Sequence, residues 1–302
     1  MNNYAALDAY SAGVSYPIEK NVALSGYCSF RIGGPADRAA WPDSVDSFCE
    51  LVCLLRGAGI RFTVVGNGSN MLFDDAGYRG TVVFTSRMRQ ISLADTVLTA
   101  ECGTPLISMT RAACRAGLSG LEFAHGIPGS CGGAVVMNAG AYGGEICDVL
   151  TRAQVLDVSD GGVLTMQRDE LDFGYRHSIF SERDLILLSA DFALKPCNPE
   201  EIRSAMEELM QRRIDRQPLD MPSAGSVFKR CEGRYIGRMI EEAGLKGKRI
   251  GGAAVSVKHA GFIVNEGGAS SADVLKLIQC IKEEIRSRYG VELECEVRYQ
   301  KV

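Results

Sequence analysis

The spacing of apolar residues predicts alternating helices and strands over the first two thirds of the chain. From Val45 to Leu55 the apolar positions recur at helical spacing, so we expect a helix within residues 43–59, capped by Asp43 or Ser44. Other segments are short, rich in β-branched residues and bounded by turn residues, which is typical of strands. The further elements expected here are strands at 60–65, 81–84 and 96–101 and a helix from Pro105 to Ala116.

The middle of the chain is predicted to be rich in strands and to end at a domain boundary. Strands are expected at 152–158, 163–166 and 185–194. The last of these is a nearly continuous apolar run, which predicts a buried strand. A strongly charged helix then begins at Asn198-Pro199 and runs to about Gln217. The change of composition at this point predicts a domain boundary near residue 198.

The last third is predicted to combine two helices, at 235–243 and 271–289, with a terminal strand. Over residues 291–299 apolar and charged side chains alternate, which predicts one buried and one solvated strand face. The apolar face would hold Val291, Leu293, Cys295, Val297 and Tyr299, and the charged face Glu292, Glu294, Glu296 and Arg298.

Composition excludes several classes of protein. The 302 residues include 33 basic and 37 acidic side chains, a formal net charge of −4, so we expect no nucleic-acid partner. No apolar run approaches the roughly 18 residues of a membrane span, and an apolar run with a basic flank is absent from the N-terminus. We therefore expect no membrane partner and no signal or transit peptide. Neither composition nor pattern predicts an oligomeric state.

The 11 cysteines include no CxxC pair, which predicts buried free thiols in a reducing cytoplasm, with neither a disulfide framework nor a zinc finger. Cys49 and Cys53 lie four residues apart on the predicted helix at 43–59. We expect them to pack in the core and not to bind a metal, since no histidine is near them in the sequence. No metal site is predicted elsewhere in the chain.

Charge is unevenly distributed along the chain. Residues 1–200 carry 15 basic and 22 acidic groups, whereas residues 201–302 carry 18 and 15. Seven basic side chains lie between Lys229 and Arg249, against three acidic ones. This run is either a solvated helix face or part of a pocket for an anionic ligand such as a phosphate ester.

The 34 glycines gather at residues 32–36, 66–70 and 126–145. Each cluster alone is explained by turns, but together, with polar Asn67, Ser69, Asn70, Ser130 and Asn138 among them, they favour a cradle for a dinucleotide. The GNGSNM segment lacks the third glycine of GxGxxG, and no GxxxxGK[ST] motif occurs, so a Rossmann site and a P-loop are both excluded. A large dinucleotide held by several separate loops remains.

A set of longer motifs now identifies a family. They are SFRIGGPAD (29–37), VVGNGSNML (64–72), GLEFAHGIPGSCGGAVVMNAGAYGGE (120–145), GYRHSIF (174–180), AGSVFK (224–229), HAGFIVN (259–265) and ECEVRY (294–299). Their residues and order closely resemble the UDP-N-acetylenolpyruvoylglucosamine reductase family, over nearly the whole chain. The absence of a tyrosine from residues 177–225 is similar to the shorter type, which lacks a tyrosine-bearing substrate loop.

The resemblance implies an α+β fold, with an FAD-binding part of the p-cresol methylhydroxylase type. By position, residues 1–85 and 86–197 would be two α/β subdomains around the flavin. Residues 198–302 would form a C-terminal α/β substrate-binding domain, whose last strand returns towards the flavin site. The basic run from Lys229 to Arg249 would then meet a UDP diphosphate, which adds weight to the pocket interpretation.

The resemblance also implies the chemistry. NADPH would reduce non-covalent FAD, and the reduced flavin would then reduce the enolpyruvyl ether of a UDP-sugar to UDP-N-acetylmuramate, a peptidoglycan precursor made in the cytoplasm. By its place in the family motifs, Ser226 would donate the proton, Arg176 would stabilise the substrate carboxylate, and Glu296 would stabilise the enol form. Alternation alone does not distinguish Glu296 from Glu292 or Glu294.

The remaining expected contacts lie around these motifs. For substrate they are Tyr175, Lys229, Arg230 and Arg234. For the cofactor they are Gly66, Asn67, Gly68, Ser69, Asn70, Gly126, Ile127, Pro128, Gly129, Ser130, Gly132, Gly133, Ala134, Asn138, Gly140 and Ala141. His125 and His259 are expected to be structural, His177 is not expected to be the acid, and Tyr142 is either a flavin neighbour or a core residue. The alternatives are a flavin oxidase of the same wider fold acting on a sugar or lactone, and a non-catalytic nucleotide-sugar-binding module.

Overall fold

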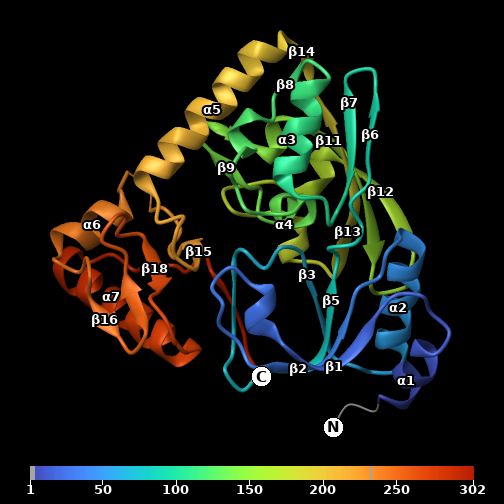
Figure 1. Ribbon diagram of the computed structural model, residues 1–302, viewed down its shortest axis with the longest axis horizontal. Coiled ribbons are helices and arrows are strands. Elements are labelled where there is room, and N and C mark those ends of the chain that lie inside the picture. The colour runs from blue at the N-terminus through green and yellow to red at the C-terminus, as the bar shows by residue number, and fades with distance from the viewer. Residues whose placement is uncertain (1–3, 232) are drawn as a thin grey trace. The chain divides into compact units, whose positions relative to one another are not determined.

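The computed structural model describes residues 4–231 and 233–302 (Figure 1). The chain divides into two units. Unit 1 comprises the residues up to Glu19, Arg38–Asn67 and Gly80–Arg213. Unit 2 comprises Lys20–Asp37, Gly68–Arg79 and Ile214–Val302. Each unit is therefore assembled from stretches that are far apart in the sequence. No helix among the described residues is both long and apolar enough to cross a membrane.

A five-stranded antiparallel sheet forms the centre of unit 1. Its spatial order is β12 (Val163–Gln167), β11 (Leu150–Asp157), β13 (Leu185–Ala193), β7 (Val97–Glu101) and β6 (Ile91–Ala94). The predicted burial of β13 is confirmed, since Leu187, Leu188 and Phe192 are almost inaccessible to solvent. The strand is buried because it pairs with β11 on one side and with β7 on the other.

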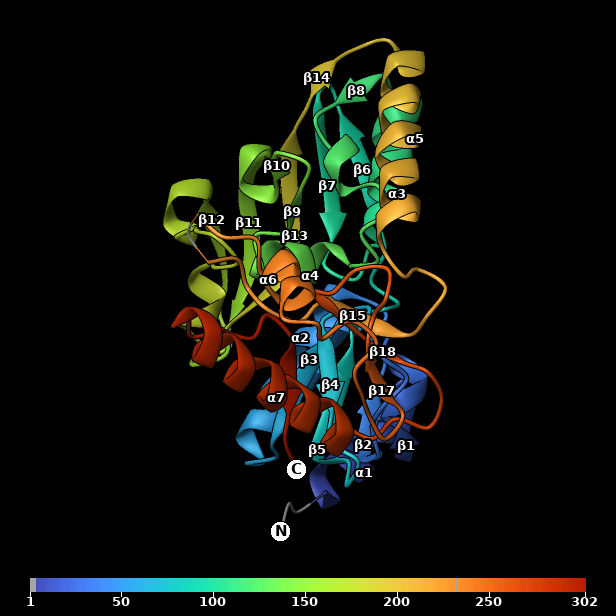
Figure 2. The same cartoon turned by 90° about the vertical axis from the view of Figure 1, so that its left-hand side faces the viewer.

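Two helices of unit 1 and a third that begins in unit 1 and runs past its end at Arg213 accompany this sheet. They are α3 (Leu106–Arg115), α4 (Cys131–Val136) and α5 (Pro199–Arg216). Helix α4 packs on β13. Helix α5 packs on α3 through Cys114, Ile202 and Met206, and the two helices run side by side (Figure 2). Most of the remaining surface of α5 is charged and exposed, as its sequence predicts.

Helix α2 (Val45–Gly57) confirms the helix predicted within residues 43–59 and identifies its cap. The Ser44 hydroxyl accepts a hydrogen bond from the Ser47 backbone N–H at 3.2 Å, and the Ser44 N–H donates to the Ser47 hydroxyl at 3.1 Å. This reciprocal arrangement is a capping box. The helix buries Phe48, Leu51, Val52 and Leu55, and it contacts α1 (Ala5–Ser11).

A four-stranded sheet contains strands that the sequence analysis did not all predict. Its order is β1 (Ile18–Ala23), β2 (Pro35–Ala40), β5 (Tyr78–Phe84) and β3 (Phe62–Val65), with β3 parallel to β5. Strands β3 and β5 correspond to predicted apolar runs. Strands β1 and β2 carry Lys20, Asp37 and Arg38, and neither alternates cleanly, so the pattern gave no strand signal.

Unit 2 contains a second four-stranded sheet with two helices. The order is β15 (Ser223–Ser226), β18 (Phe262–Asn265), β17 (Ala253–Val255) and β16 (Arg249–Ile250). Helices α6 (Ile236–Glu242) and α7 (Ser271–Tyr289) confirm the two helices predicted in this third. A capping box between Ser270 and Asp273 begins α7, and Gly290, with φ of 65°, ends it.

The predicted terminal strand over 291–299 is wrong for most of its length. Only β19 (Arg298–Gln300) is a strand, and it pairs in parallel with β4 (Met71–Phe73). Burial still alternates, with Leu293 and Val297 buried and Glu292 and Glu294 exposed. The alternation therefore reflects the burial of one side of an extended segment. This segment lacks the regular backbone hydrogen bonds to a neighbouring strand that would make it a strand.

Short elements complete the chain. Two-residue strand pairs are β8 (Leu118–Ser119) with β14 (Lys195–Pro196) and β9 (Gly140–Ala141) with β10 (Gly144–Glu145). The 3-10 turns are Leu24–Tyr27, Glu122–Ala124, Ile146–Asp148, Arg168–Leu171 and Ile179–Ser181.

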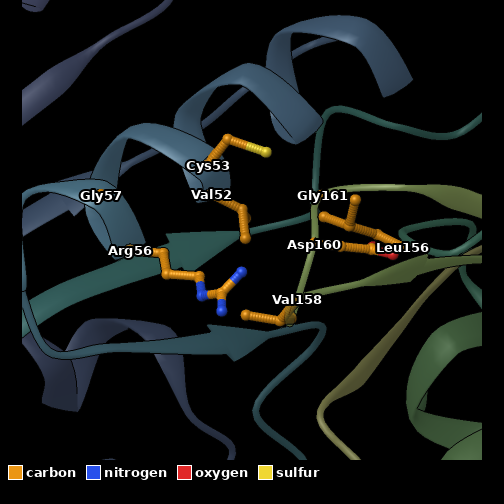
Figure 3. A pocket seen from close by; sticks show the side chains of 8 residues that line it. All are labelled: Val52, Cys53, Arg56, Gly57, Leu156, Val158, Asp160 and Gly161. Atoms are coloured by element: carbon orange, nitrogen blue, oxygen red, sulfur yellow. The ribbon is translucent and has the colours of Figure 1, made fainter.

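The 11 cysteines are all free, as expected, but not all are buried. Burial raises the pKa of Cys49 to about 11. Cys53 is exposed, so its expected place in the core is wrong. It lies where helix α2 faces the turn after β11 and lines a hollow of about 260 Å³ with Arg56 and Asp160 (Figure 3). None of the predicted site residues lines this hollow.

Candidate functional site

Within unit 1, the first two residues of the second glycine cluster, Gly66 and Asn67, lie close to the third cluster. A Cβ atom added to Gly66 would lie 2.1 Å from the Ser130 hydroxyl oxygen, so only glycine fits there. The Asn67 side-chain amide donates to the Pro128 carbonyl at 3.1 Å. Two segments predicted to hold the same cofactor are therefore adjacent, and each fixes the other.

The third cluster is not simply a loop, because Cys131–Val136 forms helix α4. The Ser130 hydroxyl caps this helix by accepting the Gly133 N–H at 3.3 Å. Gly132 is needed for packing, since its N–H donates to the Cys102 carbonyl at 2.7 Å and an added Cβ would lie 3.0 Å from the same oxygen. The space next to Gly143 is open.

The first glycine cluster serves the packing of unit 2. A Cβ on Gly34 would lie 2.1 Å from the Asp75 carbonyl oxygen, and one on Gly33 would lie 2.6 Å from the Phe73 Cβ. Gly68, at φ of 61°, likewise approaches the Tyr27 carbonyl, which would lie 2.3 Å from an added Cβ. These contacts explain glycine there without a ligand.

Arg176 is attached to the third cluster. Its guanidinium donates to the Asn138 carbonyl at 3.4 Å and to the Gly140 carbonyl at 3.2 Å, and it lies 5.1 Å from the centre of the Tyr175 ring. The backbone of Arg176 has φ of 53°, which an arginine rarely adopts. The predicted carboxylate clamp and two predicted cofactor-loop residues thus form one local structure.

Asn138, predicted to contact the cofactor, directs its side chain into the protein. Its amide nitrogen donates to the Glu145 carboxylate at 2.9 Å and to the Gly174 carbonyl at 3.0 Å, and its oxygen accepts the Cys147 N–H at 3.0 Å. The residue is 1% exposed. Its side chain therefore holds the segment that carries Arg176, a role that no sequence signal indicated.

Ser226 and Glu296 are brought together in unit 2. Ser226 is an exposed residue at the end of β15, opposite Phe262 of β18. The Glu296 N–H donates to the carbonyl of Val227, the next residue, at 2.7 Å. The Glu296 carbonyl in turn accepts the Asn70 side-chain amide at 3.0 Å. Two hydrogen bonds and the peptide bond between Ser226 and Val227 thus link three predicted site residues. These are Ser226, the proton donor, Glu296, the catalytic glutamate, and Asn70, a cofactor contact.

The structure distinguishes Glu296 from its neighbours, which alternation did not. Glu294 is exposed and paired with Lys229, and Glu292 is exposed and paired with Arg286 at 3.0 Å. Glu296 is half-buried. The two exposed glutamates are solvated surface residues, whereas Glu296 lies against the segment that carries Ser226.

Most of the predicted basic run is paired with glutamates. Ion pairs join Lys229 to Glu294, Arg238 to Glu242, Lys246 to Glu241 and Arg249 to Glu266. For these four residues the geometry agrees with a solvated, ion-paired surface. Arg234 donates to the Tyr289 carbonyl at 3.5 Å, and Arg230 is exposed.

The three histidines all have polar partners. His125 Nδ1 lies 3.0 Å from the Thr110 hydroxyl, and His177 Nε2 lies 3.3 Å from Asp172 and 3.5 Å from Glu182. His259 Nδ1 accepts the Gly261 N–H at 3.1 Å. Burial lowers the pKa of both His125 and His259.

Comparison with known proteins connects these features. A family model described as an FAD binding domain matches residues 36–167, and a model of the C-terminal domain of UDP-N-acetylenolpyruvoylglucosamine reductase matches residues 217–300. The UDP-N-acetylenolpyruvoylglucosamine reductase of Lactiplantibacillus plantarum is 47% identical over 93% of both chains. That of Caldanaerobacter subterraneus is 48% identical over 92% of both. The chain belongs to the UDP-N-acetylenolpyruvoylglucosamine reductase family.

A solved structure of the same family supports the fold. The enzyme from Thermus caldophilus is 36% identical, with a TM-score of 0.82 over 94% of this chain and 99% of that one. The predicted α+β fold, with an FAD-binding domain followed by the C-terminal domain of this family, is confirmed.

The residues present in this reductase-family chain fit an FAD. Both adjacent glycine segments of unit 1, at Gly66–Asn67 and 126–145, lie within the stretch that matches the FAD-binding domain. Beside Gly66 lies the buried Thr85 hydroxyl, which has no hydrogen-bond partner among the residues that the structure describes and is 3.9 Å from a Cβ added at Gly66. An orphaned polar atom next to a glycine cradle is a suitable place for a polar ligand atom.

Proposed function

We propose that this chain reduces the enolpyruvyl ether of UDP-N-acetylglucosamine enolpyruvate to UDP-N-acetylmuramate, with NADPH as the electron source. Membership of the reductase family supports the reaction class. The observation that carries the proposal for this chain is the link between Ser226 and Glu296, through the 2.7 Å hydrogen bond from the Glu296 N–H to the Val227 carbonyl. We place the activity in the cytoplasm, where the UDP-sugar and NADPH, its small-molecule partners, are found.

The cofactor is assigned to the glycine segments. FAD supplies hydride transfer when bound, and Gly66–Asn70 with the segment 126–141 would hold it. We assign residues 1–85 and 86–197 to flavin binding and residues 198–302 to substrate binding. The matched ranges 36–167 and 217–300 support this division, and the bond between Asn70 and Glu296 supports a return of the chain end to the cofactor loop.

The reaction requires side chains that bind the substrate carboxylate, donate a proton and stabilise the enol form. Arg176 is proposed to hold the substrate carboxylate, because a guanidinium pairs with a carboxylate through two parallel hydrogen bonds. After hydride addition, the carbon bearing that carboxylate becomes electron-rich, and the Ser226 hydroxyl is proposed to protonate it. Glu296 is proposed to stabilise the enol form by sharing a proton. Tyr175, Arg230 and Arg234 are proposed substrate contacts. Lys229, paired with Glu294, is proposed to support the Ser226 oxygen by its charge.

The proposal is tested by separating the two half-reactions of the purified protein. We expect a yellow protein whose flavin is reduced by NADPH and reoxidised by the enolpyruvyl substrate. Ser226→Ala should leave flavin reduction nearly intact and slow reoxidation by substrate by at least about 100-fold. A colourless protein, or NADPH consumption that is indifferent to the substrate, would contradict the proposed function. Rapid reoxidation by oxygen with no response to substrate would favour an oxidase.

A further inference from the structure

The turn between β17 and β18 is closed by its own side chains. The buried Ser256 hydroxyl accepts the backbone N–H groups of Lys258 and His259, each at 3.2 Å. The Phe262 N–H donates to the His259 carbonyl at 2.9 Å, and the Gly261 N–H donates to His259 Nδ1 at 3.1 Å. His259 therefore bonds to the backbone two residues further on, as an asparagine does in an Asx-turn.

The His259 ring is held on several sides. It is half-buried and lies edge-on to the Phe262 ring, with 4.9 Å between the ring centres and 69° between the planes. Its Cε1 atom would lie 3.5 Å from a Cβ added at Gly237 of α6. Burial lowers the pKa of His259, which favours the neutral ring. Because Nδ1 accepts a hydrogen bond, the proton of the neutral ring is on Nε2.

The turn is connected directly to Ser226. The Val227 N–H donates to the Gly261 carbonyl at 2.9 Å, and Ser226 is opposite Phe262 in the β15–β18 pair. An ideal Cβ on Gly261 would lie 3.0 Å from His259 Cε1 and 3.9 Å from the Ser226 hydroxyl oxygen. The imidazole and the hydroxyl therefore both lie next to the same side of Gly261.

Ser226 needs such an anchor because its own strand is irregular. The register of β15 against β18 shifts between Ser223 and Ser226, and Gly225 has φ of 75° with open space around it. Gly225 therefore lies in an irregular stretch of β15, in a left-handed conformation that favours glycine, so the residue before the serine is not part of a regular strand. The hydrogen bond from Val227 to Gly261 directly follows the serine, and the Gly261 N–H donates to His259 Nδ1.

We propose that His259 is a positioning residue for Ser226, holding Gly261 through Nδ1 so that Val227 and the serine hydroxyl keep one orientation. This inference rests on the proposed function, in which Ser226 donates the proton. A displacement of about 1 Å in a reacting group is enough to lower a rate by about 100-fold. The residue is therefore expected to affect proton delivery to the substrate and not the reduction of the flavin.

Two substitutions separate this role from general packing. In His259→Asn the amide oxygen is bonded to Cγ, as Nδ1 is, so it can still accept the Gly261 N–H. In His259→Gln the amide lies one bond further out and cannot close the same turn. Val257→Ala, which shortens a side chain that is 73% exposed in the same turn, is the matched control.

The three variants are compared with the unmodified protein as FAD-loaded enzymes in stopped flow. We expect flavin reduction by NADPH to be unchanged in all of them. Reoxidation by substrate should fall about 10- to 100-fold in His259→Gln, with a larger solvent deuterium isotope effect, and stay within about threefold in His259→Asn and Val257→Ala. Recovery by asparagine is not expected of a residue that only fills space.

The outcomes are distinguishable. If substrate fails to reoxidise the unmodified enzyme, the proposed function itself is wrong, and the role of His259 is withdrawn with it. If the unmodified enzyme turns over and His259→Gln reoxidises at the same rate, only the positioning role is overturned. Equal losses in both half-reactions, or equal losses in the asparagine and glutamine variants, would also overturn it.

Discussion

At the scale of single residues, the contacts of a side chain distinguish a proposed catalytic residue from an ordinary surface residue of the same type. Three glutamates alternate along residues 292–296, and the sequence pattern gives them the same standing. In the structure two are exposed in ion pairs, whereas Glu296 is half-buried and bonded through its backbone to Val227. Motif resemblance singles out Glu296, and its partial burial distinguishes it from the two surface glutamates.

This distinction predicts a difference between two matched substitutions. Glu296→Gln removes a proposed proton-sharing group, so reoxidation of the reduced flavin by substrate should slow by at least about 100-fold. Glu292→Gln removes a partner of Arg286 on the surface, where ion pairs contribute little, so we expect less than a threefold change. Stopped-flow absorbance of the flavin measures both. If both substitutions slowed reoxidation equally, the burial of Glu296 would not explain its role.

At the scale of elements, the sequence predicted what has a strong pattern. Helices α2 and α7 follow from apolar spacing, helix α5 from its Asn-Pro start and charged composition, and strand β13 from a continuous apolar run. Strands β1 and β2 were missed because their charged residues interrupt the alternation of apolar and polar residues that predicts a strand. Helix α4 was missed because its glycines suggested a loop. The inward side chain of Asn138 depends on Glu145, Cys147 and Gly174, and no local pattern reports that contact.

The pairing of β19 with β4 is reinforced by one side-chain hydrogen bond. The Tyr299 hydroxyl donates to Asp74, which lowers the pKa of that carboxyl and raises the pKa of Tyr299 to about 12. Because the pKa of Asp74 is lower in the folded state, Asp74 stabilises the fold at pH values above its unfolded pKa near 4. This contribution is lost as the pH falls. A raised tyrosine pKa adds stability below about 10 and loses it between about 10 and 12.

Tyr299→Phe should therefore lower the free energy of unfolding by about 1 kcal/mol at pH 7. The difference from the unmodified protein should shrink both in acid, below about pH 4, and above about pH 10. Urea unfolding across this pH range measures it. Tyr235→Phe, at a ring that is 79% exposed, is the control and should change stability by less than about 0.5 kcal/mol. A constant difference at every pH would rule out the bond to Asp74 as its source.

At the scale of the whole molecule, charge is organised more locally than composition suggests. The net charge of −4 averages an acidic stretch before residue 201 and a basic one after it. Within the basic stretch, four of the seven residues from Lys229 to Arg249 have glutamate partners. Among these seven residues, Arg230 and Arg234 are proposed to contact the substrate, so we expect the electrostatic attraction of an anionic substrate to depend on them.

Arg230→Gln and Arg234→Gln should each raise the KM for the UDP-sugar by about 3- to 10-fold at low salt. The difference should narrow as ionic strength rises, because salt screens exposed charges. Arg238→Gln removes an exposed charge already paired with Glu242 and serves as the control. Steady-state assays at two salt concentrations measure the effect. Unchanged KM values in both variants would show that Arg230 and Arg234 are solvated surface residues that do not attract the substrate.

The composition of unit 2 from distant stretches has a consequence for biosynthesis. Strand β4 pairs with β19, and the Asp74–Tyr299 contact that joins them spans 225 residues of sequence. At ribosomal rates of about 5–20 residues per second, β4 would wait roughly 11–45 seconds for this partner. A nascent chain therefore carries an unpaired strand edge while most of unit 1 emerges, and unit 2 closes only after residue 300 has been synthesised.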